Sequence, residues 1–263
     1  MNLKDKKLFL LDMDGTIYLD QELFDGTLDF LEHVKKIGGR AMYLTNNSSK
    51  SVLKYIEKLG SMGIKAEEKD FTTSAQATAL YLLKTHKDNL IYVFGTQALK
   101  DEFKKYGLNI TDKLCDEIKC LTMGFDTELC FQKLEDACIL LNRGVDYIAT
   151  NPDWVCPTWY GSVPDCGSVS EMLYNATKRR PKFIGKPEPT MIELAIEQTG
   201  FCKDEAVILG DRLYTDIASG SNAGIDTALM LSGESTMDDV KAFDGKAPTY
   251  IFDNIRCFLN AIL

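Results

Sequence analysis

The chain has 263 residues, a formal net charge of −9 at pH 7, and a composition of 45% hydrophobic and 26% charged residues. These values are typical of globular proteins and argue against long disordered segments. A net negative surface repels a phosphate backbone, which disfavours nucleic-acid binding but allows a small anionic substrate at a locally positive site. The length suits one large α/β domain or two smaller ones.

Other classes of protein are disfavoured by what the sequence lacks. It contains no run of about 18 apolar residues, so we expect no transmembrane helix and no membrane partner. The apolar residues 8–11 are followed by Asp12 and Asp14, which breaks any signal-peptide pattern, and we expect a cytoplasmic protein. The eight cysteines include no Cys-x-x-Cys pair, so we expect reduced, mostly buried thiols. With only two histidines, a Ser-His-Asp triad is disfavoured.

The N-terminal part of the chain alternates predicted strands and helices, which is typical of parallel βαβ units. Phe30 and Val34 share one face of the first helix, and Gly38 and Gly39 end it. The predicted order is strand 7–12, helix 25–37, strand 40–45 and a helix from Ser48 or Ser49 to about Met62.

The same alternation continues along the rest of the chain, without a low-complexity linker that would mark a domain boundary. A second α/β block is predicted as strand 90–94, helix 96–106, strand 121–125, helix 131–141 and strand 147–150. An irregular stretch, 151–168, follows it. The last part is predicted as strand 206–209, helix 215–223, strands 226–231 and 249–252, and a terminal helix from Ile255.

Acidic residues follow the first strand in the sequence Asp12-Met13-Asp14-Gly15-Thr16. Ligands of open α/β sheets bind beyond the carboxyl ends of the strands. Two carboxylates at that place repel each other unless a cation lies between them, and Mg²⁺ prefers oxygen ligands. The alternative is an Asp-rich turn that merely ends the strand.

Two further motifs follow other strands. Thr45-Asn46-Asn47-Ser48 offers a hydroxyl and amides at a helix N-terminus, which suits an anion, although Ser48 could simply cap that helix. Gly185-Lys186-Pro187 places a lysine in a turn, where it could neutralise a phosphate or stay a solvated surface residue.

A second acidic motif, from Gly210 to Asp216, follows the strand 206–209. It adds Asp211 and Asp216, although Asp216 alone could be a first-turn helix residue favoured by the helix dipole. Each motif has a purely structural explanation. Together they indicate one crevice with the groups that Mg²⁺-assisted phosphoryl transfer needs: a nucleophile, an acid/base, a cation and a phosphate clamp.

These four motifs, in this order, resemble those of the haloacid dehalogenase (HAD) superfamily of phosphatases. The likeness extends to its NagD-like branch, with the p-nitrophenyl phosphatases, and is carried by the four motifs together with Ala149-Thr150-Asn151-Pro152-Asp153. The resemblance covers nearly the whole chain, and we find no departure at a catalytic position.

The resemblance implies a role for each matching residue. Asp12 would be the nucleophile that forms an aspartyl-phosphate, and Asp14 would protonate the leaving group and later deprotonate the attacking water. Asp12, Asp211 and the backbone carbonyl of Asp14 would bind Mg²⁺, with Asp216 supporting that site. Thr45 would hold the phosphoryl group and Lys186 would bridge Asp12 and the phosphate. Further phosphate-binding positions would be Gly15, Asn46 and Asn47.

The resemblance also implies the fold: a Rossmann-like, doubly wound parallel-sheet core with an inserted α/β cap of the C2 type. We expect the core in residues 1–86 and 181–263 and the cap in 87–180. The cap would exclude water and select the leaving group. Its candidate specificity residues lie in the stretch 151–167 and are Asp153, Trp159 and Tyr160. These side chains could instead pack the cap or a dimer contact.

The sequence therefore predicts a Mg²⁺-dependent phosphatase for a small phosphorylated metabolite, such as a sugar phosphate or nucleoside monophosphate. Phosphoglycolate and pyridoxal phosphate also suit the class. The alternatives are a phosphomutase, which uses the same intermediate, and a non-catalytic member that binds a phosphorylated ligand. The complete motifs argue against the second, because a binding protein need not keep Asp12, Asp14 and Asp211. A homodimer through the cap is suggested by the resemblance alone.

Overall fold

The computed structural model describes residues 2–158 and 160–263, and its backbone forms two compact units. The first unit contains residues 1–45, 52–72 and 186–263, and the second contains residues 46–51 and 73–185. The second unit is thus larger than the cap predicted for 87–180. The difference arises because helix α3 (Ser74–Thr85) packs against α4 (Gln97–Lys105) of the second unit, rather than within the core.

The first unit is built on a six-stranded sheet of order β15-β14-β13-β1-β4-β5. From β15 to β4 the neighbouring strands pair in parallel. The strands are β1 (Leu8–Leu11), β4 (Arg40–Thr45), β5 (Phe71–Thr73), β13 (Ala206–Gly210), β14 (Asp226–Met230) and β15 (Tyr250–Phe252). The chain runs from β1 outward through β4, and the later strands extend in the other direction from β13. The order reverses between β1 and β13, and such a switch point is where open α/β sheets bind ligands.

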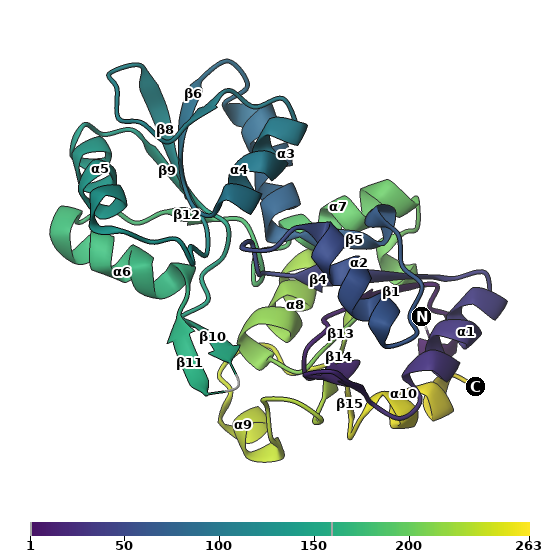
Figure 1. The fold of residues 1–263 in the computed structure, drawn as a ribbon. Helices are drawn as coiled ribbons and strands as arrows, with labels where there is room; N and C mark the ends of the chain where they lie inside the picture. Colours follow the sequence, from purple (N-terminus) through teal and green to yellow (C-terminus); the bar gives the residue numbers. More distant parts are fainter. Residues whose placement is uncertain (1, 159) are drawn as a thin grey trace. The chain divides into compact units, whose positions relative to one another are not determined.

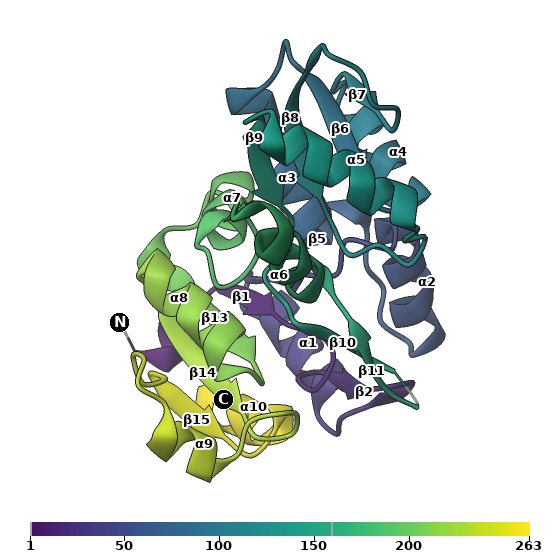
Figure 2. The same cartoon turned by 90° about the vertical axis from the view of Figure 1, so that its left-hand side faces the viewer.

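Helices cover both faces of this sheet. Phe9 of β1 contacts Phe30 of α1 (Thr27–Lys36), with ring centroids 5.3 Å apart, and Phe258 of α10 (Ile255–Ile262), 6.2 Å apart. Helix α2 (Val52–Ser61) joins the same hydrophobic cluster. On the other face α7 (Thr190–Thr199) contacts β1 and β4, and α8 (Ala218–Ala223) lies against β14 (Figure 2). The first unit also contains the short helix α9 (Met237–Ala242).

The segments that follow β1 and β13 are tight turns. After β1, Gly15 adopts a φ of +80°, and its N–H donates to the carbonyl of Tyr18 over 2.8 Å. A two-stranded antiparallel hairpin, β2 (Tyr18–Leu19) and β3 (Glu22–Leu23), continues from this turn. After β13, a π-helical turn over Leu213–Ile217 leads into α8. The predicted helix 215–223 therefore begins as this wider turn.

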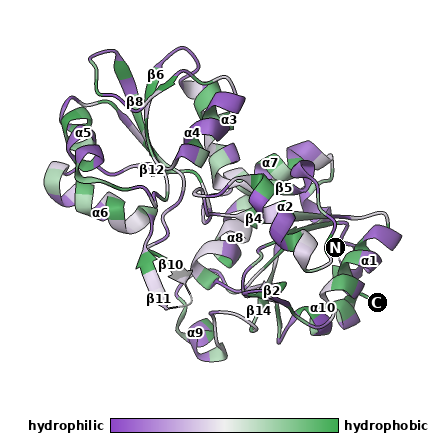
Figure 3. Ribbon diagram, viewed as in Figure 1, coloured by the Kyte–Doolittle hydropathy of each residue, from purple (hydrophilic) through white to green (hydrophobic). Residues whose placement is uncertain are grey.

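The second unit contains a five-stranded sheet of order β12-β9-β8-β6-β7, all parallel. Its strands are β6 (Leu90–Phe94), β7 (Ile110–Thr111), β8 (Ile118–Met123), β9 (Asp146–Ala149) and β12 (Lys182–Phe183). Helices α3 and α4 lie on one side, and α5 (Phe131–Asn142) and α6 (Cys166–Thr177) on the other (Figure 1). Figure 3 shows β8 as a hydrophobic strand, while α3 and α5 carry both hydrophilic and hydrophobic residues. This is the pattern of a sheet buried between amphipathic helices.

One stretch of the second unit differs from the prediction. Residues 151–168, predicted to be irregular, contain an antiparallel hairpin of β10 (Val155–Thr158) and β11 (Gly161–Pro164). The prolines and the glycine in this stretch argue against strands, because both residues are depleted in strand interiors. They are tolerated here because both strands of this isolated hairpin are edge strands. Tyr160 lies between the two strands and is 64% exposed. Trp159 lies outside the described residues.

The architecture agrees with the predicted fold class: two mostly parallel α/β units, the second inserted in the chain of the first. All eight cysteines are free thiols, as predicted, but the prediction that most are buried is wrong: only Cys120 and Cys166 are buried, Cys130 and Cys202 are exposed, and the other four are half-buried. Across the described residues, the longest and most apolar helices still fall short of what crossing a membrane requires.

The aromatic cluster of the first unit should dominate the stability of that unit. Phe30 is fully buried between Phe9 and Phe258, so Phe30→Ala should lower the free energy of unfolding by about 3–5 kcal/mol. Urea denaturation followed by circular dichroism measures this. Phe131→Ala is the matched control, because Phe131 is 78% exposed and its loss should change stability by less than about 0.5 kcal/mol. Equal effects of the two substitutions would contradict this packing.

Candidate active site

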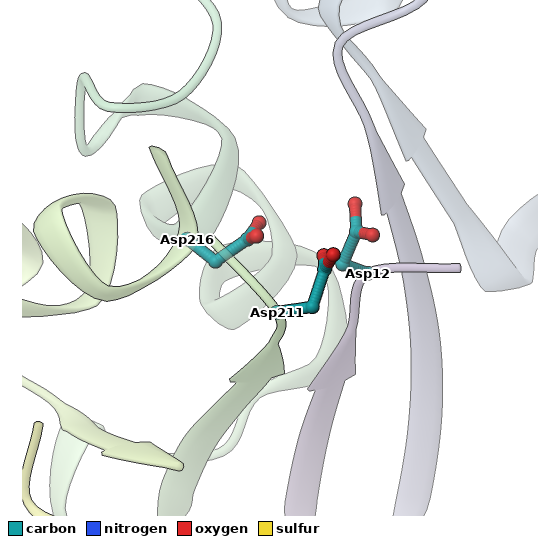
Figure 4. A group of neighbouring side chains, drawn as sticks. All are labelled: Asp12, Asp211 and Asp216. Atoms are coloured by element: carbon teal, nitrogen blue, oxygen red, sulfur yellow. The ribbon is translucent and has the colours of Figure 1, made fainter. Parts of the chain in front are cut away.

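Three carboxylates meet at the carboxyl ends of β1 and β13. Asp12, Asp211 and Asp216 each offer one oxygen within 4.8 Å of the others (Figure 4). Asp12 directly follows β1 and Asp211 directly follows β13, while Asp216 comes from the π-helical turn. The two strands pair in register, and the N–H of Asp12 donates to the carbonyl of Leu209 over 2.9 Å. The sheet therefore fixes the distance between the two ends.

A buried lysine lies between two of these carboxylates. The Nζ of Lys186 is 2.6 Å from Asp12 Oδ1 and 2.6 Å from Asp216 Oδ1, and it also donates to the carbonyl of Leu44 over 3.4 Å. Its side chain is 4% exposed, which excludes the solvated surface lysine considered above. Burial lowers the pKa of Lys186, but the two carboxylates more than reverse this and hold it above its usual value. Lys186 is therefore cationic at neutral pH.

The cluster still lacks positive charge. Burial raises the pKa of Asp12 to about 8, although Lys186 opposes the shift. Burial and the nearby Asp216 raise the pKa of Asp211 to about 6. Three carboxylates against one ammonium leave two negative charges when all are ionised. Such an excess in a buried place favours a cation.

The surroundings of Asp211 fit a metal ion. Its Oδ1 is buried and accepts no hydrogen bond from the described part of the chain. Its Oδ2 accepts from the N–H of Glu234 over 2.7 Å, which fixes the orientation of the carboxylate. A Cβ added to Gly15 would lie 2.5 Å from Asp211 Oδ2, so the turn after β1 approaches Asp211 closely because residue 15 is glycine. A hard cation with oxygen ligands suits this donor set.

Asp216 is placed differently from the other two carboxylates. Its Oδ1 faces Lys186, and its Oδ2 accepts from the N–H of Arg212 over 3.2 Å. Both oxygens therefore have donors from the protein. This arrangement suits the supporting role predicted for Asp216, which would orient Lys186 rather than bind a metal directly.

The Asp14 side chain is not one of the three carboxylates of the cluster and is 63% exposed. Its partial burial raises its pKa, and Lys58 of α2, with Nζ 3.8 Å from Asp14 Oδ2, opposes the shift. The same ammonium lies 3.9 Å from the ring centroid of Tyr18, a cation–π contact. An exposed carboxyl beside a turn is free to exchange protons with a substrate or with water. Sequence reasoning missed Lys58, because it lies on a helix with an ordinary amphipathic pattern.

The predicted residues Asn46, Asn47 and Asp153 belong to the second unit, whereas Thr45 is buried at the end of β4 in the first. The side-chain amide of Asn46 donates to Asp153 Oδ1 over 3.1 Å. The backbone carbonyl of Asn46 accepts from the Asn151 amide and the Ser74 hydroxyl, each over 2.6 Å. Asp153 is thus a partner of Asn46, which the sequence did not indicate.

The neighbouring Asn47 and Ser48 have local roles in the same unit. Asn47 Oδ1 accepts from the N–H and the hydroxyl of Ser49, over 2.9 and 2.8 Å. Ser48 does not cap α2, which was the structural explanation considered above. Its hydroxyl pairs with Thr150 over 3.0 Å and accepts from the N–H of Phe125 over 3.0 Å.

Comparison with known proteins agrees with this geometry. Residues 9–109 match the family model described as haloacid dehalogenase-like hydrolase, and residues 183–257 match the model described as HAD-hydrolase-like. The chain is 32% identical over 260 residues to an acid sugar phosphatase of Staphylococcus haemolyticus, covering 99% of this chain and 98% of that protein. The chain belongs to the haloacid dehalogenase-like hydrolases.

Solved structures narrow the family further. The 4-nitrophenylphosphatase of Thermotoga maritima has a TM-score of 0.94 and 39% identity, over 99% of both chains. NagD of Escherichia coli K-12 has a TM-score of 0.87 and 30% identity, over 97% of this chain and 98% of that one. The magnesium complex of a glycerol phosphate phosphatase of Mycobacterium tuberculosis has a TM-score of 0.91 and 28% identity, over 98% of this chain and 78% of that one. The chain is a NagD-like HAD phosphatase, a phosphoric monoester hydrolase, which confirms the predicted family, fold class and enzyme class.

Removing Asp216 should destabilise this HAD core, because the buried Lys186 would lose one of its two carboxylate partners. Breaking a buried ion pair on one side costs about 3–5 kcal/mol. Asp216→Ala should lower the free energy of unfolding in urea by less than this, because Lys186 keeps Asp12 and the repulsion between Asp216 and the other two carboxylates is relieved. Asp238→Ala is the control, since its side chain is 90% exposed and pairs with Lys241 at the surface. An unchanged urea midpoint for Asp216→Ala would show that Lys186 does not depend on Asp216.

Proposed function

We propose that this phosphatase is Mg²⁺-dependent and hydrolyses a small phosphorylated metabolite through an aspartyl-phosphate on Asp12. The observation that carries the proposal is the buried group of Asp12, Lys186, Asp211 and Asp216 at the switch point of the first sheet. It combines a nucleophile, a fixed cation and a place for a metal ion. These are the parts that phosphoryl transfer needs.

In the first step the Asp12 carboxylate attacks the phosphorus atom. Lys186 holds Asp12 Oδ1 and, together with the charge that a bound metal ion would supply, favours the ionised carboxylate; the same ammonium neutralises charge on the phosphoryl oxygens. The P–O bond to the leaving group breaks as the bond to Asp12 forms. Asp14 gives its proton to the departing alkoxide.

In the second step Asp14, now ionised, takes a proton from a water molecule. The water oxygen attacks the phosphorus, the bond to Asp12 breaks, and inorganic phosphate leaves. Asp12 is again a carboxylate and Asp14 is again protonated, so the cycle closes. Thr45, Gly15, Asn46 and Asn47 are proposed to hold the phosphoryl oxygens during both steps, as the family resemblance implies.

The metal ion would be held by the carboxylates of Asp12 and Asp211 and by the backbone carbonyl of Asp14. When bound, it would supply the positive charge that the cluster lacks and stabilise charge on the transferred phosphoryl group. Two observations support Mg²⁺: the buried, unpartnered Oδ1 of Asp211, and the magnesium named with the mycobacterial relative.

The substrate class that the relatives favour is a sugar or polyol phosphate. Two of them are named as acid sugar phosphatase and glycerol phosphate phosphatase. The second unit is proposed to act as the cap that selects the leaving group, with Asp153, Tyr160 and Trp159 as candidate contacts. The homodimer and the cytoplasmic location suggested by the sequence stay predictions.

The test of this function is hydrolysis of p-nitrophenyl phosphate with Mg²⁺ or with EDTA. Wild type should hydrolyse it only with Mg²⁺. Asp12→Asn should lose turnover completely, because an amide cannot form the acyl phosphate, and a circular dichroism spectrum like that of wild type should show that the variant is folded. A panel of sugar, polyol and nucleoside phosphates, read by phosphate release, then identifies the preferred substrate. Turnover by Asp12→Asn above the buffer rate would refute the mechanism.

Asp153 should affect activity through Asn46. Asp153→Ala removes one acceptor of the Asn46 amide, which should loosen the orientation of that amide and lower kcat/KM by about tenfold, since one hydrogen bond to a charged group contributes about 1.5–3 kcal/mol. Steady-state kinetics on the preferred phosphate measure the fall. Asp88→Ala, an exposed position of the same unit, should leave kcat/KM unchanged. Equal kcat/KM values for the two variants would show that Asp153 does not contribute to phosphate binding.

A further inference from the structure

The loop that follows β14 makes close backbone contact with the proposed metal site. We refer to residues Ser232–Ser235 as the β14 loop. Besides the bond from Glu234 to Asp211 Oδ2, the N–H of Ser235 donates to the Asp211 carbonyl over 3.1 Å. The Ser232 hydroxyl donates to the carbonyl of Gly15 over 2.8 Å. The loop therefore holds both the side chain and the backbone of Asp211, and also the turn that carries Asp14.

This approach depends on a glycine in the loop. A Cβ added to Gly233 would lie 2.1 Å from Asp211 Oδ2, closer than any real contact. The backbone of Gly233 has no positive φ, so residue 233 needs glycine for space and not for its conformation. Asp211 Oδ2 is thus enclosed by Gly15 and Gly233, while Oδ1 accepts no hydrogen bond from the described residues.

The side chain of Glu234 fixes the loop from the other side. Its Oε2 lies 2.9 Å from Arg212 Nε, and its Oε1 accepts from the Tyr214 hydroxyl over 2.7 Å. Arg212 also donates its backbone N–H to Asp216 Oδ2. We call these three residues, Arg212, Tyr214 and Glu234, the Glu234 cluster. Their contacts join the β14 loop to the segment that follows Asp211. Because Arg212 neutralises Glu234, the cluster acts by position and not by adding negative charge.

We propose that Glu234 is a positioning residue for Asp211, and that the β14 loop with the Glu234 cluster sets the affinity of the site for a divalent cation. The inference rests on the proposed function, in which Asp211 holds Mg²⁺. Mg²⁺ demands nearly ideal octahedral geometry, so a small rotation of the Asp211 carboxylate weakens binding. Residues that orient metal ligands typically change metal affinity about 10- to 100-fold when they are replaced.

The test is calorimetric titration of the metal-free full chain with MgCl₂. Glu234→Ala and Gly233→Ala should each raise the Kd for Mg²⁺ by about 10- to 100-fold. Tyr214→Phe removes one of the two contacts of Glu234 and should have a smaller effect. Gly60→Ala is the matched control, because a Cβ at Gly60 meets nothing within 4 Å, and it should bind Mg²⁺ as wild type does.

Two more readouts separate positioning from a general loss of structure. In EDTA, Glu234→Ala should unfold at nearly the same temperature as Gly60→Ala. At saturating Mg²⁺ its kcat should return close to wild type, while the Mg²⁺ concentration for half-maximal activity rises by the same factor as the Kd. A lower kcat that excess Mg²⁺ does not restore would contradict the proposal. If Gly233→Ala fails to fold, the Kd values of Glu234→Ala and Tyr214→Phe for Mg²⁺ test the proposal without it.

The same titrations separate this inference from the proposed function. Asp211→Asn should lose Mg²⁺ binding. If wild type does not bind Mg²⁺, or Asp211→Asn binds it equally well, the proposed metal site is wrong. If Asp211→Asn loses binding and Glu234→Ala binds as wild type does, the metal site stands and the role of Glu234 is refuted.

Discussion

The buried ammonium of Lys186 is the interaction on which the candidate site depends. It lies 2.6 Å from both Asp12 and Asp216, which are 174 and 30 residues away along the chain. A buried charge without partners destabilises a fold by several kcal/mol, so the first unit is stable only when these distant segments come together. The contact that assembles the site is therefore also a condition for folding, and Lys186 links the chain's return from the second unit to the end of β1.

The sheet topology explains why the carboxylates meet where they do. β1 and β13 pair in parallel and in register, so the residues that follow them leave the sheet at the same edge. The strand order reverses between these two strands, and open α/β sheets bind ligands at such a switch point. Asp12 and Asp211 hence emerge side by side, and the tight turns after each strand hold them there. The β14 loop leaves the same edge one strand further on and reaches Asp211 from the other side.

The sequence predicted the parts of this structure whose signals are local. Continuous apolar runs predict β1, β6 and β13. The acidic residues after β1 and β13 are predicted to form a site because they directly follow two of these runs. The hairpin of β10 and β11 was missed because its prolines and glycine are depleted in ordinary strands. Helix α3 has no counterpart among the predicted elements, and its place in the second unit depends on contacts with α4 that no local pattern encodes. For the same reason the contact of Asp153 with Asn46 and that of Glu234 with Asp211 were not predicted, since each joins residues far apart in sequence.

The electrostatics of the site connect its stability to its proposed activity. Burial raises the pKa of Asp12 and of Asp211, which means that the ionised cluster is unfavourable in the protein alone. Lys186 offsets only part of this, and the fixed backbone donors at Asp211 satisfy only one of its oxygens. A divalent cation that binds the folded chain and not the unfolded one stabilises the fold by mass action. The fold thus holds its carboxylates in an arrangement that a bound cation would stabilise. This is the preorganisation that phosphoryl transfer requires, because the groups need not move when charge develops on the phosphoryl oxygens.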